Sequence, residues 1–163
     1  MNKPDVVEFD VVLTAAGTAV GKMRNEVVVT HGGEGSTFEM ATDEAAVHGG
    51  DNTAPPPLAY FATGLVGCLM TQIRTFSKKL RIPIDDVSVI ATCHWRGKMV
   101  PGNPYETEPI GFDFDIDIES DASKEDLVRL IGTAKKGCFI EQTLAQSNRL
   151  NHRFRFEKEW IDI

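Results

Sequence analysis

The chain has 163 residues, of which 42% are hydrophobic and 25% are charged, as is ordinary for a globular protein. This length predicts a single domain spanning residues 1–163, or one protomer of an intertwined dimer, with a real core. The net charge of −7 argues against binding to nucleic acid or to an anionic membrane, because the field of the protein repels phosphate groups.

The cellular compartment is predicted from the termini, the hydropathy and the cysteines. Residues 1–5 do not show a basic start followed by an apolar stretch, so no signal peptide is expected. No apolar run approaches the ~20 residues that span a bilayer. The three cysteines, Cys68, Cys93 and Cys138, form neither a CxxC pair nor a secreted disulfide framework. A cytoplasmic protein without a lasting structural disulfide is therefore expected, although a transient catalytic disulfide stays open.

The first third of the chain has the pattern of a strand meander. The strands are expected at Val6–Leu13, Lys22–His31 and Ser36–Ala41, because β-branched or alternating apolar residues lie there between glycine-containing turns. The residues from Thr42 to Asn52 then form a polar connection.

A long helix follows this connection. Thr53 is the expected N-cap, and the prolines at 55 to 57 suit a first helical turn, whose N–H groups need no partner. Apolar residues recur at helical spacing as far as Leu80, and Pro83 ends the helix. Gly64 and Gly67 lie inside it, and each costs about 1 kcal/mol relative to alanine. They indicate close approach of another backbone, within the protomer or across a dimer interface.

The second half of the chain continues with strands and shorter helices. Residues 111–119 alternate apolar and acidic side chains, which predicts a strand with one buried and one exposed face. Ser123 is expected to cap a helix. Further elements are expected as strands at Val87–Arg96 and Asn151–Lys158 and as a helix at Phe139–Ser147. Since strands cluster along the chain, the fold class is α+β, with antiparallel sheets around a long central helix.

Two cysteine segments carry a resemblance to a known family. Residues 58–68, LAYFATGLVGC, resemble the helix of OsmC/Ohr proteins in which small residues lead into a cysteine. Residues 134–140, AKKGCFI, resemble the place of that family's second cysteine, and residues 80–89 resemble its segment after the long helix. The resemblance covers about residues 50–157.

The resemblance implies an intertwined homodimer that reduces organic hydroperoxides and protects against stress. Cys68 would be the peroxidatic cysteine and Cys138 the resolving one. The reaction would proceed through a sulfenic acid at Cys68 and a disulfide with Cys138, which an external dithiol would reduce.

The chain departs from the family pattern at three positions. The stretch from Pro56 to Ala59 contains no acid where Ohr proteins have a glutamate. Residues 15–21 contain no arginine, so Arg24 is the nearest candidate for the family's arginine. Phe139 follows the second cysteine in place of proline. Glu141, one turn beyond Cys138, is a substitute to consider for the missing acid.

These departures motivate a second hypothesis from a different class. In it, the protein is a catalytically inactive OsmC-like dimer that binds a small apolar ligand at the dimer interface, and both thiols are inert core residues. Cys93, beside Trp95, is expected to pack in the core. No cofactor or metal is expected, because the four histidines show no ligand spacing and the acids at 113, 115 and 117 lie along an exposed ridge.

Overall fold

The computed structural model describes residues 6–163. The prediction that no signal peptide begins at residues 1–5 lies outside the described residues. The chain divides into two compact units, the first ending at Phe61 and the second beginning at Ala62. The prediction of one domain over residues 1–163 stays a prediction. Within residues 6–163, no helix is long and apolar enough to cross a membrane.

The first unit contains a three-stranded antiparallel sheet in the order β1-β2-β3. Its strands are β1 (Leu13–Val20), β2 (Arg24–His31) and β3 (Thr37–Thr42). The pairs Leu13↔His31 and Asn25↔Thr42 set the two registers. A short 3-10 helix, η1 (Ala46–His48), follows. The predicted meander is therefore confirmed, together with the positions of its second and third strands to within two residues.

The predicted position of the first strand is wrong. The residues from Val6 to Val12 are not part of a strand, and β1 begins only at Leu13. A strand needs a partner for its backbone hydrogen bonds, and the turn at residues 21–23 pairs residues 13–20 with β2. Hairpin register therefore overrides the β-propensity of the valine-rich segment before it.

The long helix is α1 (Pro57–Leu80), and it runs from the first unit into the second. Its predicted end at Leu80 is confirmed, but Thr53 is not its N-cap. Pro57 takes the first helical position, where a missing N–H costs nothing. The Thr53 hydroxyl instead donates a hydrogen bond to Asp43 and accepts one from Arg24.

The second unit contains an antiparallel two-stranded ribbon. Its strands are β4 (Asp86–Lys98) and β5 (Glu106–Glu119), and the register shifts between His94 and Trp95. On β5, Phe112, Phe114, Ile116 and Ile118 are half-buried, whereas the acids between them are exposed. The predicted alternation is confirmed, and the structure extends the strand at its start from Gly111 to Glu106.

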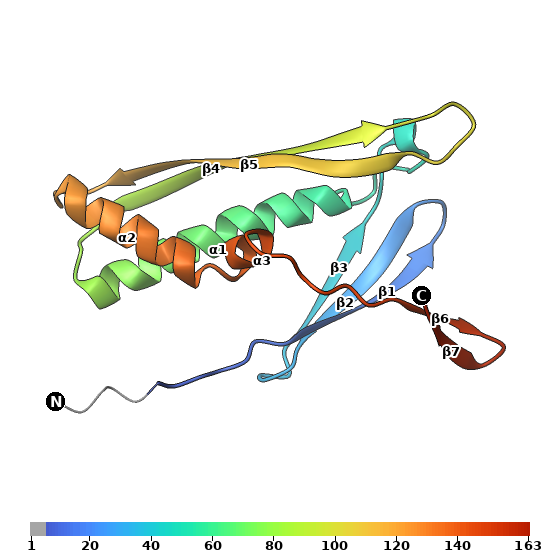
Figure 1. The fold of residues 1–163 in the computed structure, drawn as a ribbon, viewed down its shortest axis with the longest axis horizontal. Coiled ribbons are helices and arrows are strands. Elements are labelled where there is room, and N and C mark those ends of the chain that lie inside the picture. The colour runs from blue at the N-terminus through green and yellow to red at the C-terminus, as the bar shows by residue number, and fades with distance from the viewer. Residues whose placement is uncertain (1–5) are drawn as a thin grey trace. The chain divides into compact units, whose positions relative to one another are not determined.

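The ribbon and the helices of the second unit enclose its core. Figure 1 shows α1 running beneath the β4–β5 ribbon, with α2 (Lys124–Gly137) and α3 (Phe139–Leu144) beside it. The predicted cap of α2 is confirmed, because the N–H of Asp126 donates to Ser123 Oγ at 3.2 Å. The helix α3 is shorter than predicted and ends at Leu144. The core contains Leu69, Ile73, Ile82, Val87, Leu130, Ala134 and Cys138.

The C-terminal segment is a hairpin, where the sequence predicted one strand. Its strands are β6 (Arg153–Phe156) and β7 (Glu159–Asp162). Glu157 and Lys158 form the turn with positive φ angles of 45° and 74°. Such backbone suits the tight turns that favour glycine, asparagine or aspartate. The sequence gives no such signal here, so the turn was missed.

Candidate functional site

Cys138 lies at the corner between α2 and α3. It is the C-cap of α2 and the N-cap of α3, and its side chain is fully buried. A Cβ at the preceding residue, Gly137, would lie 2.5 Å from the Phe76 ring on α1, so any larger residue there would displace that ring. Gln142 Nε2 donates to the carbonyl of Lys135 at 2.9 Å and ties the two helices together. The corner is therefore packed closely against α1.

Cys68 lies in the middle of α1. Its side chain is half-buried and packs against the core cluster that includes Cys138. One turn earlier, a Cβ at Gly64 would lie 3.3 Å from Ile140 Cδ1 on α3. The neighbour at Gly64 is thus a side chain and not the backbone that was expected, and a Cβ at Gly67 would meet no described atom within 4 Å. Small residues on α1 let α3 approach beside Cys68.

The Cys68 thiol is near enough to act on the pKa of Cys138. Both are free thiols. The pKa of Cys138 is raised to about 11, mainly by burial and also by its interaction with Cys68 and the negative charge of Glu141. The backbone N–H of Glu141 acts in the opposite direction and lowers the pKa of Cys138. The Cys138 side chain nevertheless makes no capping hydrogen bond to α3. At neutral pH, Cys138 is therefore a neutral thiol.

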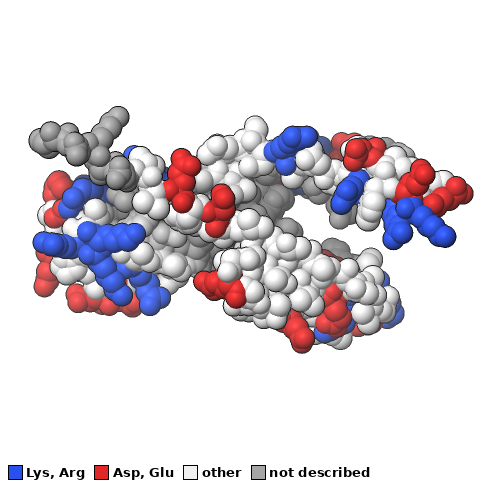
Figure 2. Space-filling view, turned by 90° about the horizontal axis from the view of Figure 1, so that it is seen from below, with Lys and Arg blue, Asp and Glu red and all other residues white. Residues whose placement is uncertain are grey.

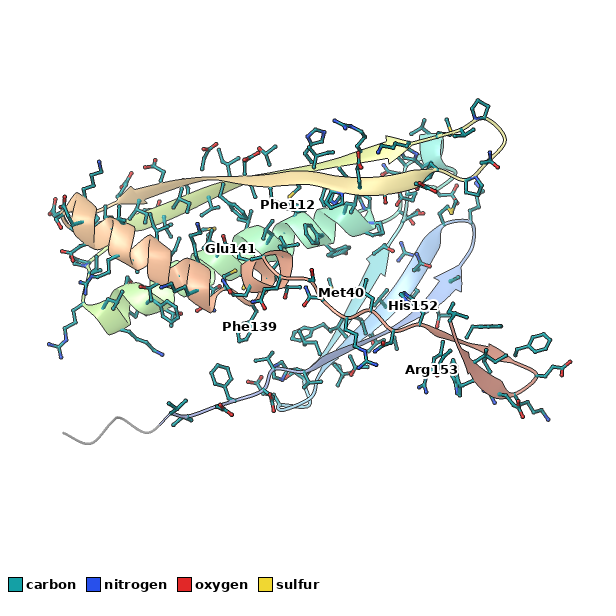
Figure 3. All side chains as sticks on the ribbon, in the orientation of Figure 1. Met40, Phe112, Phe139, Glu141, His152 and Arg153 are labelled. Carbon is teal, nitrogen blue, oxygen red and sulfur yellow. The ribbon has the colours of Figure 1, made fainter. Side chains whose placement is uncertain are left out.

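Glu141 is the acid of this site. It lies on α3, where Figure 3 labels it, and its Oε2 is buried without a hydrogen-bond partner among residues 6–163. Burial raises the pKa of its carboxyl group, and the positive charge of Lys135 opposes that shift. Glu141 follows Cys138 by three residues, and residues three apart lie close together on a helix. The sequence therefore indicates that the two residues are near each other. Its burial was not predictable, because that depends on how α3 packs.

Arg24 begins β2 in the first unit, whereas both cysteines belong to the second. Its Nε donates to Glu26 Oε1 at 2.7 Å, and its Nη1 donates to the Thr53 carbonyl at 3.0 Å and to Thr53 Oγ1 at 2.9 Å. These bonds fix the orientation of a guanidinium that is 30% exposed.

Asp43 is a buried acid that the sequence analysis missed. It is 1% exposed, and its carboxylate accepts hydrogen bonds from the N–H groups of Glu44, Asp51 and Thr53 and from the Thr53 hydroxyl. The Thr53 N–H, followed by its hydroxyl, lowers the pKa of Asp43 to about 2. The only sequence signal is an aspartate at the start of a polar, glycine-containing loop.

The remaining predicted features lie elsewhere. Cys93 is half-buried on β4 opposite Phe112, whose ring meets Trp95 edge to face at 5.5 Å. Within residues 6–163, no group of three or more His, Cys, Asp or Glu residues is arranged to hold a metal ion. A groove of about 660 Å³ lies in the second unit, and its lining includes charged residues such as Arg74, Lys78 and Asp86.

Solved structures share this fold. An OsmC-like hydroperoxide resistance protein from Jannaschia sp. CCS1 is 45% identical, covers 94% of this chain and 98% of its own, and superposes with a TM-score of 0.65. An OsmC-like protein from Mycoplasma pneumoniae is 16% identical, covers 85% and 89%, and has a TM-score of 0.61. An organic hydroperoxide resistance protein from Legionella pneumophila is 17% identical, covers 85% and 91%, and has a TM-score of 0.56.

The family assignment rests on the sequence as well as on the fold. No curated protein matches the chain. The model of the OsmC-like protein family matches residues 49–153, which include α1, both strands of the ribbon and the α2–α3 corner. Together with the 45% identity to the Jannaschia protein over nearly the full length, this match shows that the chain belongs to the OsmC/Ohr family.

Proposed function

We propose that the protein reduces organic hydroperoxides with Cys68 as the nucleophile and Cys138 as the resolving cysteine, and that it thereby protects the cell against peroxide stress. The observation that carries this proposal is that Cys68 on α1 packs against the core cluster that contains Cys138. In keeping with this, Cys68 acts on the pKa of Cys138. A transient disulfide requires such neighbours, because the sulfurs must come within bonding distance without refolding. The Jannaschia relative is described as a hydroperoxide resistance protein, which supports the substrate class.

The first step is attack on the peroxide. The Cys68 thiolate attacks the outer oxygen of a hydroperoxide ROOH and the O–O bond breaks. The products are a sulfenic acid at Cys68 and an alkoxide that takes up a proton to leave as the alcohol ROH. The sulfur is oxidised by two electrons and the peroxide is reduced by two. Half-burial of Cys68 suits an organic peroxide that reaches it with an apolar substituent.

The second step closes the cycle. The Cys138 sulfur attacks the Cys68 sulfenic sulfur, the S–O bond breaks, and water leaves as the disulfide forms. An external dithiol then reduces the disulfide by exchange and restores both thiols. We infer a reducing cytoplasmic setting for this cycle, where cysteines return to the thiol state between turnovers.

Arg24 is proposed as the cation that holds the peroxide and stabilises the leaving alkoxide. Three hydrogen bonds to Glu26 and Thr53 fix its guanidinium, and such preorganisation is what a charge-stabilising group needs. Arg24→Lys keeps the charge but loses the fork geometry. A role at the reacting oxygens predicts a lower peroxide turnover in that variant with unchanged stability.

We also propose that the protein is a homodimer. Every residue of β1 is exposed, and large apolar side chains are exposed on the C-terminal hairpin, including Phe156 and Trp160 at 56% and 57%. Figure 2 shows that charged side chains on the viewed face stand in groups separated by uncharged areas. Apolar exposure on this scale favours an association surface. Sedimentation should give about twice the 17.9 kDa mass of one chain.

The second hypothesis, an inactive dimer that binds a small apolar ligand, has less support. The groove in the second unit has charged residues in its lining, whereas apolar ligands prefer pockets with predominantly hydrophobic walls. It would gain support if the folded protein consumed no peroxide.

The direct test is consumption of cumene hydroperoxide by the reduced protein, with a dithiol as reductant. Wild-type protein and Cys93→Ser should turn over, whereas Cys68→Ser should not. Cys138→Ser should form the Cys68 sulfenic acid at the wild-type rate, but should turn over only as fast as the external dithiol reduces that sulfenic acid directly. Wild-type consumption no faster than that of Cys68→Ser, in a folded protein, would sink the peroxidase and favour the binding protein.

A further inference from the structure

Cys138 and Glu141 occupy the two positions of α3 that form a capping box in other helices. Cys138 is the N-cap and Glu141 is the third helical residue. A glutamate at this position can turn its side chain back toward the cap residue, as in a capping box. The N-cap residue and the third helical residue are the two positions whose side chains lie side by side in a capping box, so the helix geometry brings the Glu141 carboxylate to the side of α3 on which the Cys138 thiol lies. The negative charge of Glu141 acts on the Cys138 thiol, in keeping with this placement.

Glu141 is half-buried as a residue, but one oxygen of its carboxylate is fully buried. Its Oε2 is buried and accepts no hydrogen bond from any of residues 6–163. A buried polar atom without a partner costs free energy, so its retention calls for a role. The charged or titratable groups that act on this pair are Cys68 from α1 and Lys135 from α2.

The resolving step creates the need for a base. Cys138 must lose its proton as it attacks, because a thiol is a poor nucleophile. A lasting Cys138 thiolate is disfavoured by burial and by the negative charge of Glu141. Transfer of the proton from the thiol to that carboxylate avoids two adjacent negative charges, since one charge is passed from oxygen to sulfur.

From this geometry we propose that Glu141 is the general base for Cys138, an inference that rests on the proposed function. Glu141 takes the Cys138 proton as the sulfur attacks the Cys68 sulfenic sulfur. The S–S bond forms, the S–O bond breaks, and the leaving hydroxide takes the proton back from Glu141 to give water. Cys138 is oxidised, Cys68 is reduced, and Glu141 returns to its carboxylate form.

The test uses Glu141→Gln and measures two steps separately: formation of the Cys68 sulfenic acid and formation of the disulfide with Cys138. Its matched control is Glu125→Gln, which removes an exposed acid from the first turn of α2. Reduced protein is mixed with one equivalent of cumene hydroperoxide and quenched over time with a cyclic 1,3-dione. Mass spectrometry then quantifies the Cys68 sulfenic adduct and the disulfide. In Glu141→Gln, the sulfenic acid should form at the wild-type rate, and the disulfide about 100-fold more slowly.

The pH profile distinguishes a base from a structural residue. In Glu141→Gln, disulfide formation should accelerate with pH as Cys138 approaches its own pKa of about 11, so the defect should shrink in alkali. In the wild type, the same step should level off well below that pH. A wild-type rate that keeps rising tenfold for each pH unit would overturn the inference even if the variant failed to fold.

Two results separate this inference from the proposed function. Disulfide formation at the wild-type rate in Glu141→Gln, with an unchanged pH profile, would overturn the role of Glu141 and leave the peroxidase standing. No sulfenic acid on wild-type Cys68 would overturn the proposed function, and the role of Glu141 with it.

Discussion

Thr53 donates two hydrogen bonds to the buried carboxylate of Asp43, from its N–H at 2.9 Å and from its hydroxyl at 2.7 Å. The same hydroxyl accepts a hydrogen bond from Arg24 at 2.9 Å. Asp43 therefore fixes the loop before α1 and, through Thr53, the guanidinium of Arg24. This connection makes a loop aspartate part of the scaffold that orients Arg24.

The first prediction concerns acid stability. The folded pKa of Asp43, about 2, lies below its ordinary value of 3.8, because the Thr53 N–H and hydroxyl favour the charged form. Its stabilising contribution is therefore complete above pH 3.8 and is lost as the pH falls through about 2. Asp43→Asn should unfold at a lower denaturant concentration at pH 7, and should lose less stability than the wild type between these two pH values.

Asp51→Asn is the matched control for this variant. Asp51 lies in the same loop and pairs with Lys22 at 2.6 Å, but both side chains are more than half exposed. Such pairs contribute about 0–1 kcal/mol, so this variant should unfold close to the wild type. Equal unfolding midpoints for Asp43→Asn and Asp51→Asn would contradict the role given to Asp43.

The second prediction concerns the corner that holds Cys138. In Gly137→Ala the new methyl group would meet the Phe76 ring, since the Cβ position lies 2.5 Å from it. Overpacking of this kind costs about 1–3 kcal/mol, and a displaced corner should also slow disulfide formation. Both effects can be measured by denaturant unfolding and by the quenched time course.

Gly132→Ala provides the comparison within the same helix. Gly132 is exposed, and a Cβ there would meet no described atom within 4 Å. Because alanine is the better helix former, this variant should gain up to about 1 kcal/mol. If Gly132→Ala lost as much stability as Gly137→Ala, the loss would come from substitution anywhere in α2. That result would contradict the role given to the contact with Phe76.

The third prediction concerns the reactivity of Cys138. Its pKa of about 11, raised first by burial and then by Cys68, leaves very little thiolate at neutral pH. Iodoacetamide should therefore modify Cys138 slowly in the reduced protein. Cys68→Ser removes the part of the shift that Cys68 causes, so alkylation of Cys138 should accelerate near pH 9, measured by peptide mapping. An unchanged rate would mean that the two thiols do not interact.

The helices and strands whose apolar residues recur at a regular spacing were predictable from the sequence. The apolar spacing located α1 as far as Leu80, and alternation gave the exposed and buried faces of β5. The hairpins at both ends were misplaced, because strand register depends on the turns. The first turn begins at Gly21, whose φ is 69°, but Gly17 is a second glycine close by, so the sequence does not single out one turn. The turn at Glu157 contains no glycine, asparagine or aspartate.

The site was predictable only where a family pattern marks it. Resemblance drew attention to Cys68 and Cys138, and no local signal in the sequence could bring two residues so far apart into contact. The burial of Asp43 and Glu141 was not predictable at all. An acid in a polar loop or in a short helix is ordinarily exposed, and only the packing around each one removes it from water.

The most direct measurement of the central claim is a peptide map of the reduced protein after one equivalent of cumene hydroperoxide. The account predicts a disulfide between Cys68 and Cys138 in nearly every chain, with Cys93 still a free thiol. Three free thiols beside unreduced peroxide, or a disulfide that involves Cys93, would contradict it.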